Sequence, residues 1–173
     1  MGTPPSSARP AKFEQVVVAV DPPAGAGGVC GIVVAARLGT RGFVLEDASI
    51  AGASPAGWAR RVAETAGRHR AARIVVETNQ GGDMVRSVLA METPPCPIRE
   101  VRAHLGKRAR AEPVAALYEK GRIAHCGTFN ALEEEMMALG SEEEARLDRM
   151  DALVWALTDL LLTKRPMPGM FAA

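Results

Sequence analysis

The chain has 173 residues, of which 47% are apolar and 24% charged, a balance typical of one globular domain rather than of a disordered or disulfide-stapled chain. Its 21 basic and 20 acidic side chains leave a net charge of +1, which excludes a uniformly basic coat for nucleic acid. Three widely spaced cysteines form no Cys-x-x-Cys pair, so we expect neither a zinc knuckle nor disulfides, and a reducing compartment is the default. No apolar run is long enough to predict a membrane span, and no membrane partner is expected.

The first third of the chain predicts three antiparallel strands. Residues 1–13 are rich in proline and serine and are expected to be a flexible linker. The run VVVAV over 16–20 is β-branched and apolar throughout, which favours a strand buried on both faces. Glycine-containing turns separate it from further strands over 29–38 and 43–50, and this spacing predicts a meander.

Helices and strands then alternate along the chain. Ser54-Pro55 is a typical helix start, with the serine as cap. Helices are expected over about 55–70, 83–90, 112–120, 129–139 and 143–162. Strands are expected over 73–76, 98–102 and 122–125, with a polar basic loop over 103–111. The order predicts an α/β domain over 14–163 with a central mixed sheet flanked by helices, and a flexible tail over 164–173.

Four carboxylates stand at the ends of apolar elements. Asp21 ends the run VVVAV and Glu77 ends the run RIVV, while Asp148 and Asp151 lie three residues apart on the last helix and share a face. If the two strands are parallel neighbours, Asp21 and Glu77 meet at their carboxyl ends. Taken singly, these residues also suit a turn, a solvated strand end or a helix N-terminus. Together they indicate a site for two Mg²⁺ or Mn²⁺ ions, about 3.5–4 Å apart, of the kind that hydrolyses phosphodiesters.

Positive charge gathers just before the acidic block. Residues 99–122 hold seven basic and three acidic side chains, whereas residues 133–151 hold eight acidic and two basic ones. Lys107, Arg108 and Arg110, on the predicted loop, could contact nucleic-acid phosphates or could be a solvated charge run.

Other polar positions have weaker signals. The glycines of Asn79-Gln80-Gly81-Gly82 could let backbone amides approach a phosphate or could simply turn the chain. The three histidines are expected in surface or turn roles, and Trp155 in the core. Gly106-Lys107 lacks the glycine and the hydroxyl residue of a phosphate-binding P-loop, so no ATPase is expected in this chain.

Four segments taken in order resemble the C-terminal nuclease domain of the large terminase subunit, the DNA-packaging enzyme of tailed phages and phage-like gene transfer agents. They are VVVAVDPPAG, VVETNQGGDMV, KRARAEPVAALYEKGRIAH and DRMDALVWALTDLLL, and the match spans about 14–163. The resemblance implies a ribonuclease H-like fold and an acidic metal site at Asp21, Glu77, Asp148 and Asp151. It also places the family's basic segment at Lys107, Arg110 and Pro113.

That resemblance implies an endonuclease acting on double-stranded DNA in the host bacterial cytoplasm. An N-terminal ATPase domain, a portal and a small terminase subunit would be its partners, and this chain would be an excised or truncated domain, monomeric when isolated. Two alternatives stay open. A junction resolvase would act as a symmetric dimer, and an inactive ribonuclease H-like module would only bind DNA or a partner.

Overall fold

The computed structural model describes residues 8–23, 25, 27–79, 81–139 and 147–163. Within these residues, seven strands form a mixed sheet in the order β6-β5-β1-β2-β3-β7, with the short β4 paired to β2. The strands are β1 (Gln15–Asp21), β2 (Val29–Leu38), β3 (Arg41–Asp47), β4 (Ile50–Ala51), β5 (Arg73–Glu77), β6 (Ile98–Val101) and β7 (Ile123–His125). β1, β2 and β3 are antiparallel neighbours, whereas β5, β6 and β7 are added in parallel. The predicted meander and mixed sheet are therefore confirmed.

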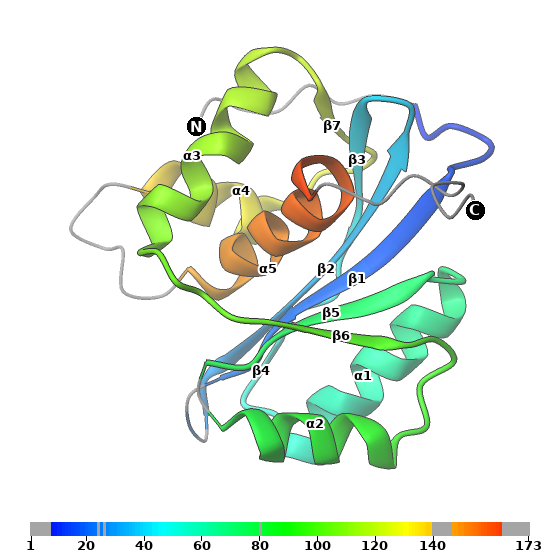
Figure 1. Cartoon of the computed structure of the whole chain (residues 1–173), viewed down its shortest axis with the longest axis vertical. Coiled ribbons are helices and arrows are strands. Elements are labelled where there is room, and N and C mark those ends of the chain that lie inside the picture. Colours follow the sequence, from blue (N-terminus) through cyan, green and yellow to red (C-terminus); the bar gives the residue numbers. More distant parts are fainter. Residues whose placement is uncertain (1–7, 24, 26, 80, 140–146, 164–173) are drawn as a thin grey trace, which may run out of the picture.

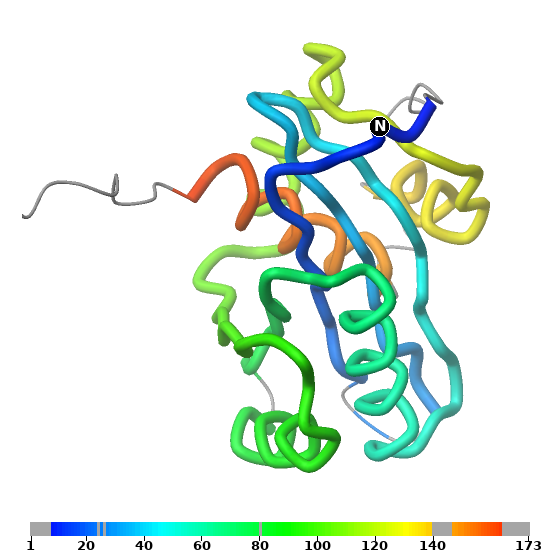
Figure 2. Tube along the Cα trace, turned by 90° about the vertical axis from the view of Figure 1, so that its right-hand side faces the viewer, coloured from blue at the N-terminus to red at the C-terminus, as the bar shows by residue number. Residues whose placement is uncertain are grey.

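Helices cover both faces of this sheet (Figure 1). They are α1 (Pro55–Arg68), α2 (Gly82–Met91), α3 (Lys107–Glu119), α4 (Asn130–Ala138) and α5 (Asp148–Leu157), and α5 continues into a π-helical turn, Thr158–Leu162. α1 and α2 lie on one face and α3, α4 and α5 on the other. Figure 2, turned by 90°, shows α1 in front of the strands and the orange α5 behind them.

Strand alternation divides the core into two clusters. Val17 and Ala19 of β1 pack with α5, whereas Val18 and Val20 pack with α1 and α2. All four are fully buried, as a central strand covered on both faces requires. The residue that follows this alternation at the end of β1, Asp21, falls on the α5 side.

Most predicted elements are present, but the expected strand over 43–50 ends at Asp47, and a predicted loop is a helix. The expected cap of α1 is confirmed, because Ser54 Oγ accepts a hydrogen bond from the Gly57 amide at 3.1 Å. The sequence favours a loop over 103–111, but α3 begins at Lys107, with Arg110 N–H bonded to the Gly106 carbonyl at 3.1 Å. Lysine, arginine and alanine are good helix formers, so the charged run is a first helical turn, and the helix continues past Pro113.

Some predictions fall outside the described residues. These are most of the N-terminal linker, the start of the last helix over 143–146, and the tail over 164–173. In the described part of the chain, none of the helices has the length and apolar character needed to cross a membrane.

Candidate active site

The backbone of β1 and β5 sets the first two carboxylates. These strands are parallel neighbours, and Val20 pairs with Val76 in register, so Asp21 and Glu77 are the next positions on each. Val75 belongs to the α5-side cluster, and Glu77, two residues later, points to the same face as Asp21. The condition under which the sequence analysis brings Asp21 and Glu77 together, that the two strands are parallel neighbours, is thus met.

Helix α5 brings the other two carboxylates to this edge of the sheet. Its first turn carries Asp148 and Asp151, and Asp151 is only 2% exposed. Gly31 of β2, which is paired with Asp21, admits the start of the helix: a β-carbon on Gly31 would stand 1.9 Å from the Asp148 carbonyl oxygen. Only a residue without a side chain leaves room for this approach.

The electrostatics of Asp21 record the crowding of negative charge. Burial raises its pKa to about 8, and repulsion from Asp151, Glu77 and Asp148 adds to the effect, while Lys107 partly offsets it. Among the described residues, Asp21 has no ion-pair partner. Asp21 is therefore within electrostatic reach of the other three carboxylates singled out in the sequence.

Two of the three predicted DNA-binding cations point into this cluster. Lys107 Nζ lies 2.6 Å from Asp151 Oδ2, and Arg110 bridges Asp151 Oδ1 at 3.1 Å and Glu77 Oε2 at 3.3 Å. Both side chains come from the first turns of α3 rather than from a loop. Arg108, between them, is exposed and has no ion pair within the described part of the chain. In this arrangement Lys107 and Arg110 pair with carboxylates, and of the three only Arg108 has no ion pair with a described residue.

Trp155 is a site residue that the sequence reasoning missed. The sequence favours a place in the core for it, but it is only partly buried, and its indole N–H donates to Glu77 Oε2 at 2.6 Å. The Arg110 guanidinium lies over its ring, 5.0 Å from the centroid. A signal was available, because Trp155 follows Asp151 by four residues and so shares its face of the helix.

The start of α5 is held by an acid from α4. Glu135 Oε2 accepts hydrogen bonds from the backbone N–H groups of Arg149, at 2.9 Å, and Met150, at 3.1 Å. Its other oxygen accepts from the Arg149 guanidinium at 2.9 Å, and Arg149 also lies 3.2 Å from Asp47 at the end of β3. This contact replaces a local cap, since Leu147 precedes the helix and cannot provide one.

His125 does not have the surface or turn role predicted for it. It is 1% exposed at the end of β7, where Nε2 bonds the Tyr118 hydroxyl at 2.8 Å and Nδ1 bonds Glu133 at 3.0 Å. Burial lowers the pKa of His125, although Glu133 opposes the shift. A neutral ring that donates to Glu133 and accepts from Tyr118 satisfies both nitrogens, so this histidine links β7, α3 and α4.

The carboxylates fit a hard divalent cation by their chemistry, although the present arrangement does not enclose one. Within the described ranges, no group of three or more histidine, cysteine or acidic residues is placed to hold a metal ion. Arg110 stands between Glu77 and Asp151, with its buried Nε lacking a hydrogen-bond partner. Oxygen donors suit Mg²⁺ or Mn²⁺, and such an ion would displace the proton that Asp21 retains because of its raised pKa.

Comparison with known proteins gives a family and a fold. The family model described as "Terminase RNaseH-like domain" matches residues 18–160. No curated protein matches the chain.

Three solved structures illustrate the likeness. The large terminase nuclease of the thermophilic phage G20c, with bound magnesium, has a TM-score of 0.68 at 16% identity over 90% of this chain and 85% of that one. The human cytomegalovirus terminase nuclease domain, soaked with manganese and bound to an inhibitor, has a TM-score of 0.61 at 12% identity, covering 89% and 88%. The large terminase of a second thermophilic bacteriophage has a TM-score of 0.61 at 13% identity, and the match covers 91% of this chain but 42% of that one.

Proposed function

The chain belongs to the terminase RNaseH-like domain family, and from this membership we propose that it is a metal-dependent endonuclease domain that hydrolyses double-stranded DNA during genome packaging. The observation that carries the proposal is geometric: Asp21 and Glu77 end two parallel neighbouring strands, and the first turn of α5, with Asp148 and Asp151, packs against Gly31, the partner of Asp21. Burial, with repulsion from the other three carboxylates, raises the pKa of Asp21 to about 8. Such a cluster is costly in a buried position, and it suits the binding of divalent cations.

Asp21, Glu77, Asp148 and Asp151 would hold the ions, which we propose to be two Mg²⁺ or Mn²⁺. When bound, such ions polarise a phosphoryl oxygen, lower the pKa of water and stabilise the leaving oxygen. The magnesium bound to one similar structure and the manganese soaked into another support this choice of metal.

The residues of the chain itself have distinct proposed parts. Trp155 and Arg110 orient the Glu77 carboxylate, which receives a hydrogen bond from one and an ion pair from the other. Lys107 partners Asp151 and limits the charge repulsion around Asp21. Arg108 remains available for a DNA phosphate, and Lys107 and Arg110 would contact phosphates only after giving up their carboxylate partners.

The wider setting follows from the family. An ATPase domain, a portal and a small terminase subunit are the proposed partners, in the cytoplasm of the host cell. The large terminase of the second thermophilic bacteriophage is matched over 42% of its length, and the remainder is compatible with further domains in such proteins.

Plasmid cleavage in Mg²⁺, Mn²⁺ or EDTA tests the proposal. The wild-type chain should nick or linearise plasmid with either ion and not with EDTA. Asp21→Asn, Glu77→Gln and Asp151→Asn should each reduce cleavage by about 100-fold or more, since each removes an oxygen ligand of the ions. The matched control is Glu64→Gln, because Glu64 is exposed on α1 and away from the cluster. A wild-type chain that binds DNA but cuts with neither ion would instead favour the inactive binding module.

A further inference from the structure

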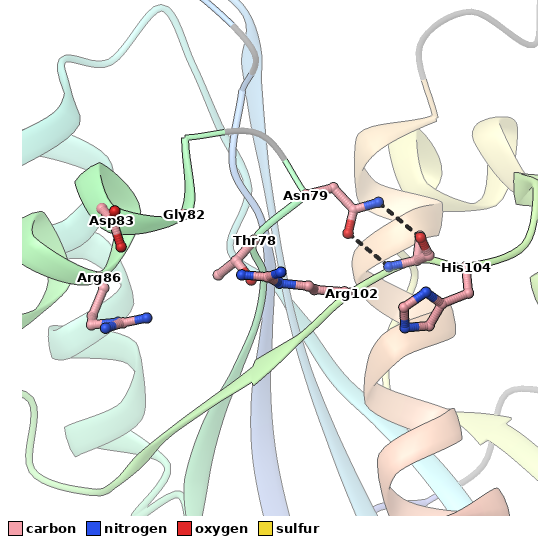
Figure 3. Close-up of a pocket in the computed structure, with 8 residues that line it drawn as sticks. Thr78, Asn79, Gly82, Asp83, Arg86, Arg102 and His104 are labelled. Atoms are coloured by element: carbon pink, nitrogen blue, oxygen red, sulfur yellow. Dashed lines mark hydrogen bonds between the residues drawn. The ribbon is translucent and has the colours of Figure 1, made fainter.

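A polar hollow lies at the carboxyl ends of β5 and β6, beside the start of α2 (Figure 3). It is an open cavity of about 410 Å³. Thr78 and Asn79, which follow Glu77 directly, form one side of it, and Arg102 and His104 form another. Thr78 follows Glu77 in sequence, but because side chains alternate along a strand it lies on the α2 side of the sheet, whereas Glu77 lies on the α5 side.

The base of the cavity is a fixed structure. The Asn79 side chain bonds Ala103 twice: its Nδ2 donates to the carbonyl at 3.1 Å, and its Oδ1 accepts from the amide at 2.7 Å, as the dashed lines in Figure 3 show. The Thr78 amide bonds the Val101 carbonyl at 3.0 Å. These bonds extend the pairing of β5 and β6 past the ends of the strands, so they fix the backbone that carries Arg102 and His104.

The two glycines of the Asn-Gln-Gly-Gly segment bring the N-terminus of α2 to the same cavity. Gly81 has a left-handed backbone, with φ of 63°, and provides no side-chain cap. A β-carbon on Gly82 would stand 3.2 Å from the Thr78 β-carbon, so the first turn packs closely against the base. Gly82 and Asp83 line the cavity, and the N–H groups of a first helical turn have no partner within their helix.

Positive charge in the cavity is not fully used by protein contacts. Among the described residues, neither Arg102 nor His104 has an ion-pair partner, whereas Arg86 is bonded by Glu100 at 2.6 and 3.0 Å. Asp83 is the one acidic residue in the lining. Lys107 and Arg110, by contrast, already pair with the cluster. Of the described side chains that line the cavity, Arg102 and His104 are therefore left without a carboxylate partner.

We propose that this cavity binds a backbone phosphate of the DNA strand that passes Glu77, with Arg102 and His104 as its side-chain donors and the α2 N-terminus as its backbone donor. The inference rests on the proposed nuclease function, and it adds a substrate-binding subsite to that function. With Arg108 on α3, which packs on the other face of the sheet, the cavity would give the DNA a second point of phosphate contact.

Fluorescence anisotropy of a labelled duplex in EDTA tests the subsite without cleavage. The double variant Arg102→Ala/His104→Ala should bind about 3- to 10-fold more weakly and show a salt slope lower by about one. Asp83→Asn should bind the duplex more tightly, because it removes a negative charge from the lining of the cavity, where it would repel the phosphate. Arg41→Ala is the matched control, since Arg41 is exposed at the opposite end of the sheet. All variants should melt within a few degrees of the wild type.

The outcomes separate this inference from the nuclease proposal. An unchanged affinity and salt slope in the double variant, or weaker binding by Asp83→Asn, would overturn the phosphate subsite even if the wild type cuts DNA. Competition of inorganic phosphate against the duplex at constant ionic strength, in the wild type but not the double variant, would support a phosphate subsite; phosphate binding that is lost in the double variant while its duplex affinity is unchanged would assign the cavity to free phosphate instead. If the wild type cuts no DNA but Arg102 controls its affinity, the subsite stands and the nuclease proposal falls.

Discussion

The carbonyl oxygen of Asp148 lies 1.9 Å from the position that a β-carbon on Gly31 would take. Because Gly31 is paired with Asp21 on the neighbouring strand, this contact seats the acidic start of α5 directly over the end of β1. The site therefore depends on the absence of a side chain as much as on the carboxylates themselves.

Gly31→Ala should displace the start of α5. We expect the free energy of unfolding to fall by about 1–3 kcal/mol through overpacking, and cleavage to fall further because Asp148 and Asp151 move together. Urea unfolding followed by circular dichroism, alongside plasmid cleavage, measures both effects. Gly67→Ala is the control: its β-carbon would meet nothing closer than 3.9 Å on a helix, so stability should hold or rise by about 0.5–1 kcal/mol. Full cleavage activity in Gly31→Ala would show that the position of α5 does not depend on its packing against Gly31.

Asp21→Asn should stabilise the metal-free protein above neutral pH. The pKa of Asp21 is raised to about 8 in the folded chain, from an ordinary value near 4, so the folded state holds an extra proton between these values. Its contribution to stability is present below about pH 4 and is lost as the pH rises towards 8. In EDTA, the wild-type melting temperature should fall over this window more than that of Asp21→Asn.

The melting temperature in the presence of Mn²⁺ also depends on Asp21. Mn²⁺ should raise the wild-type melting temperature at pH 8 by binding only the folded state, and this rise should shrink in Asp21→Asn. Equal pH profiles for both proteins in EDTA would contradict the raised pKa.

Trp155→Phe should leave the fold intact but remove a hydrogen bond that orients the Glu77 carboxylate. The substitution keeps an aromatic ring beside Arg110 but removes the indole N–H that donates to Glu77 at 2.6 Å. A hydrogen bond to a charged group contributes about 1.5–3 kcal/mol, so cleavage should fall about 10- to 100-fold. The change should appear in cleavage rather than in duplex affinity, which anisotropy measures separately. A loss of affinity equal to the loss of cleavage would point instead to a contact between Trp155 and DNA.

Arg110→Ala and Arg108→Ala should have opposite profiles, although the two arginines are two residues apart. Removing Arg110 leaves Glu77 and Asp151 without their shared cation, so the metal-free protein should lose about 3–5 kcal/mol of stability, and Mn²⁺ should restore part of it. Removing the exposed Arg108 should leave melting unchanged and lower the salt slope of DNA binding by about one. If both variants changed only DNA affinity, the carboxylate pairing of Arg110 would not matter for stability.

The sequence predicted what depends on local pattern and missed what depends on packing over long distances. Asp21 and Glu77 could be predicted to meet because apolar runs define where a strand ends, and parallel neighbours align those ends. The prediction of a loop for Lys107 and Arg110 is wrong because a charged run suits both a solvated loop and a first helical turn. The Glu135 contact with α5 could not be predicted, since no local spacing links α4 to that helix start.

The pairing of Asp159 with Arg73 and Arg99 completes the relation between α5 and β5. Asp159 is buried in the π-helical turn, bonded by Arg99 at 2.6 Å and by Arg73 at the start of β5. From Asp151 to Asp159 the helix advances about 12 Å, and from Arg73 to Glu77 the strand advances about 13 Å. The helix from Asp151 to Asp159 and the strand from Arg73 to Glu77 therefore match in length and run in opposite directions, with a contact between charged residues at each end.

At the Asp159 end, the ion pair with Arg73 links helix and strand directly. At the other end, Glu77 and Asp151 carry the same charge, so only a cation between them can link strand and helix. Ion pairs between helix and sheet thus close the Asp159 end, whereas the acidic end needs a third group, which in this structure is Arg110. Inserting one residue between Arg73 and Glu77 would lengthen the strand by about 3 Å and leave the helix unchanged. The Arg73–Asp159 ion pair and the acidic cluster could then no longer form at the same time.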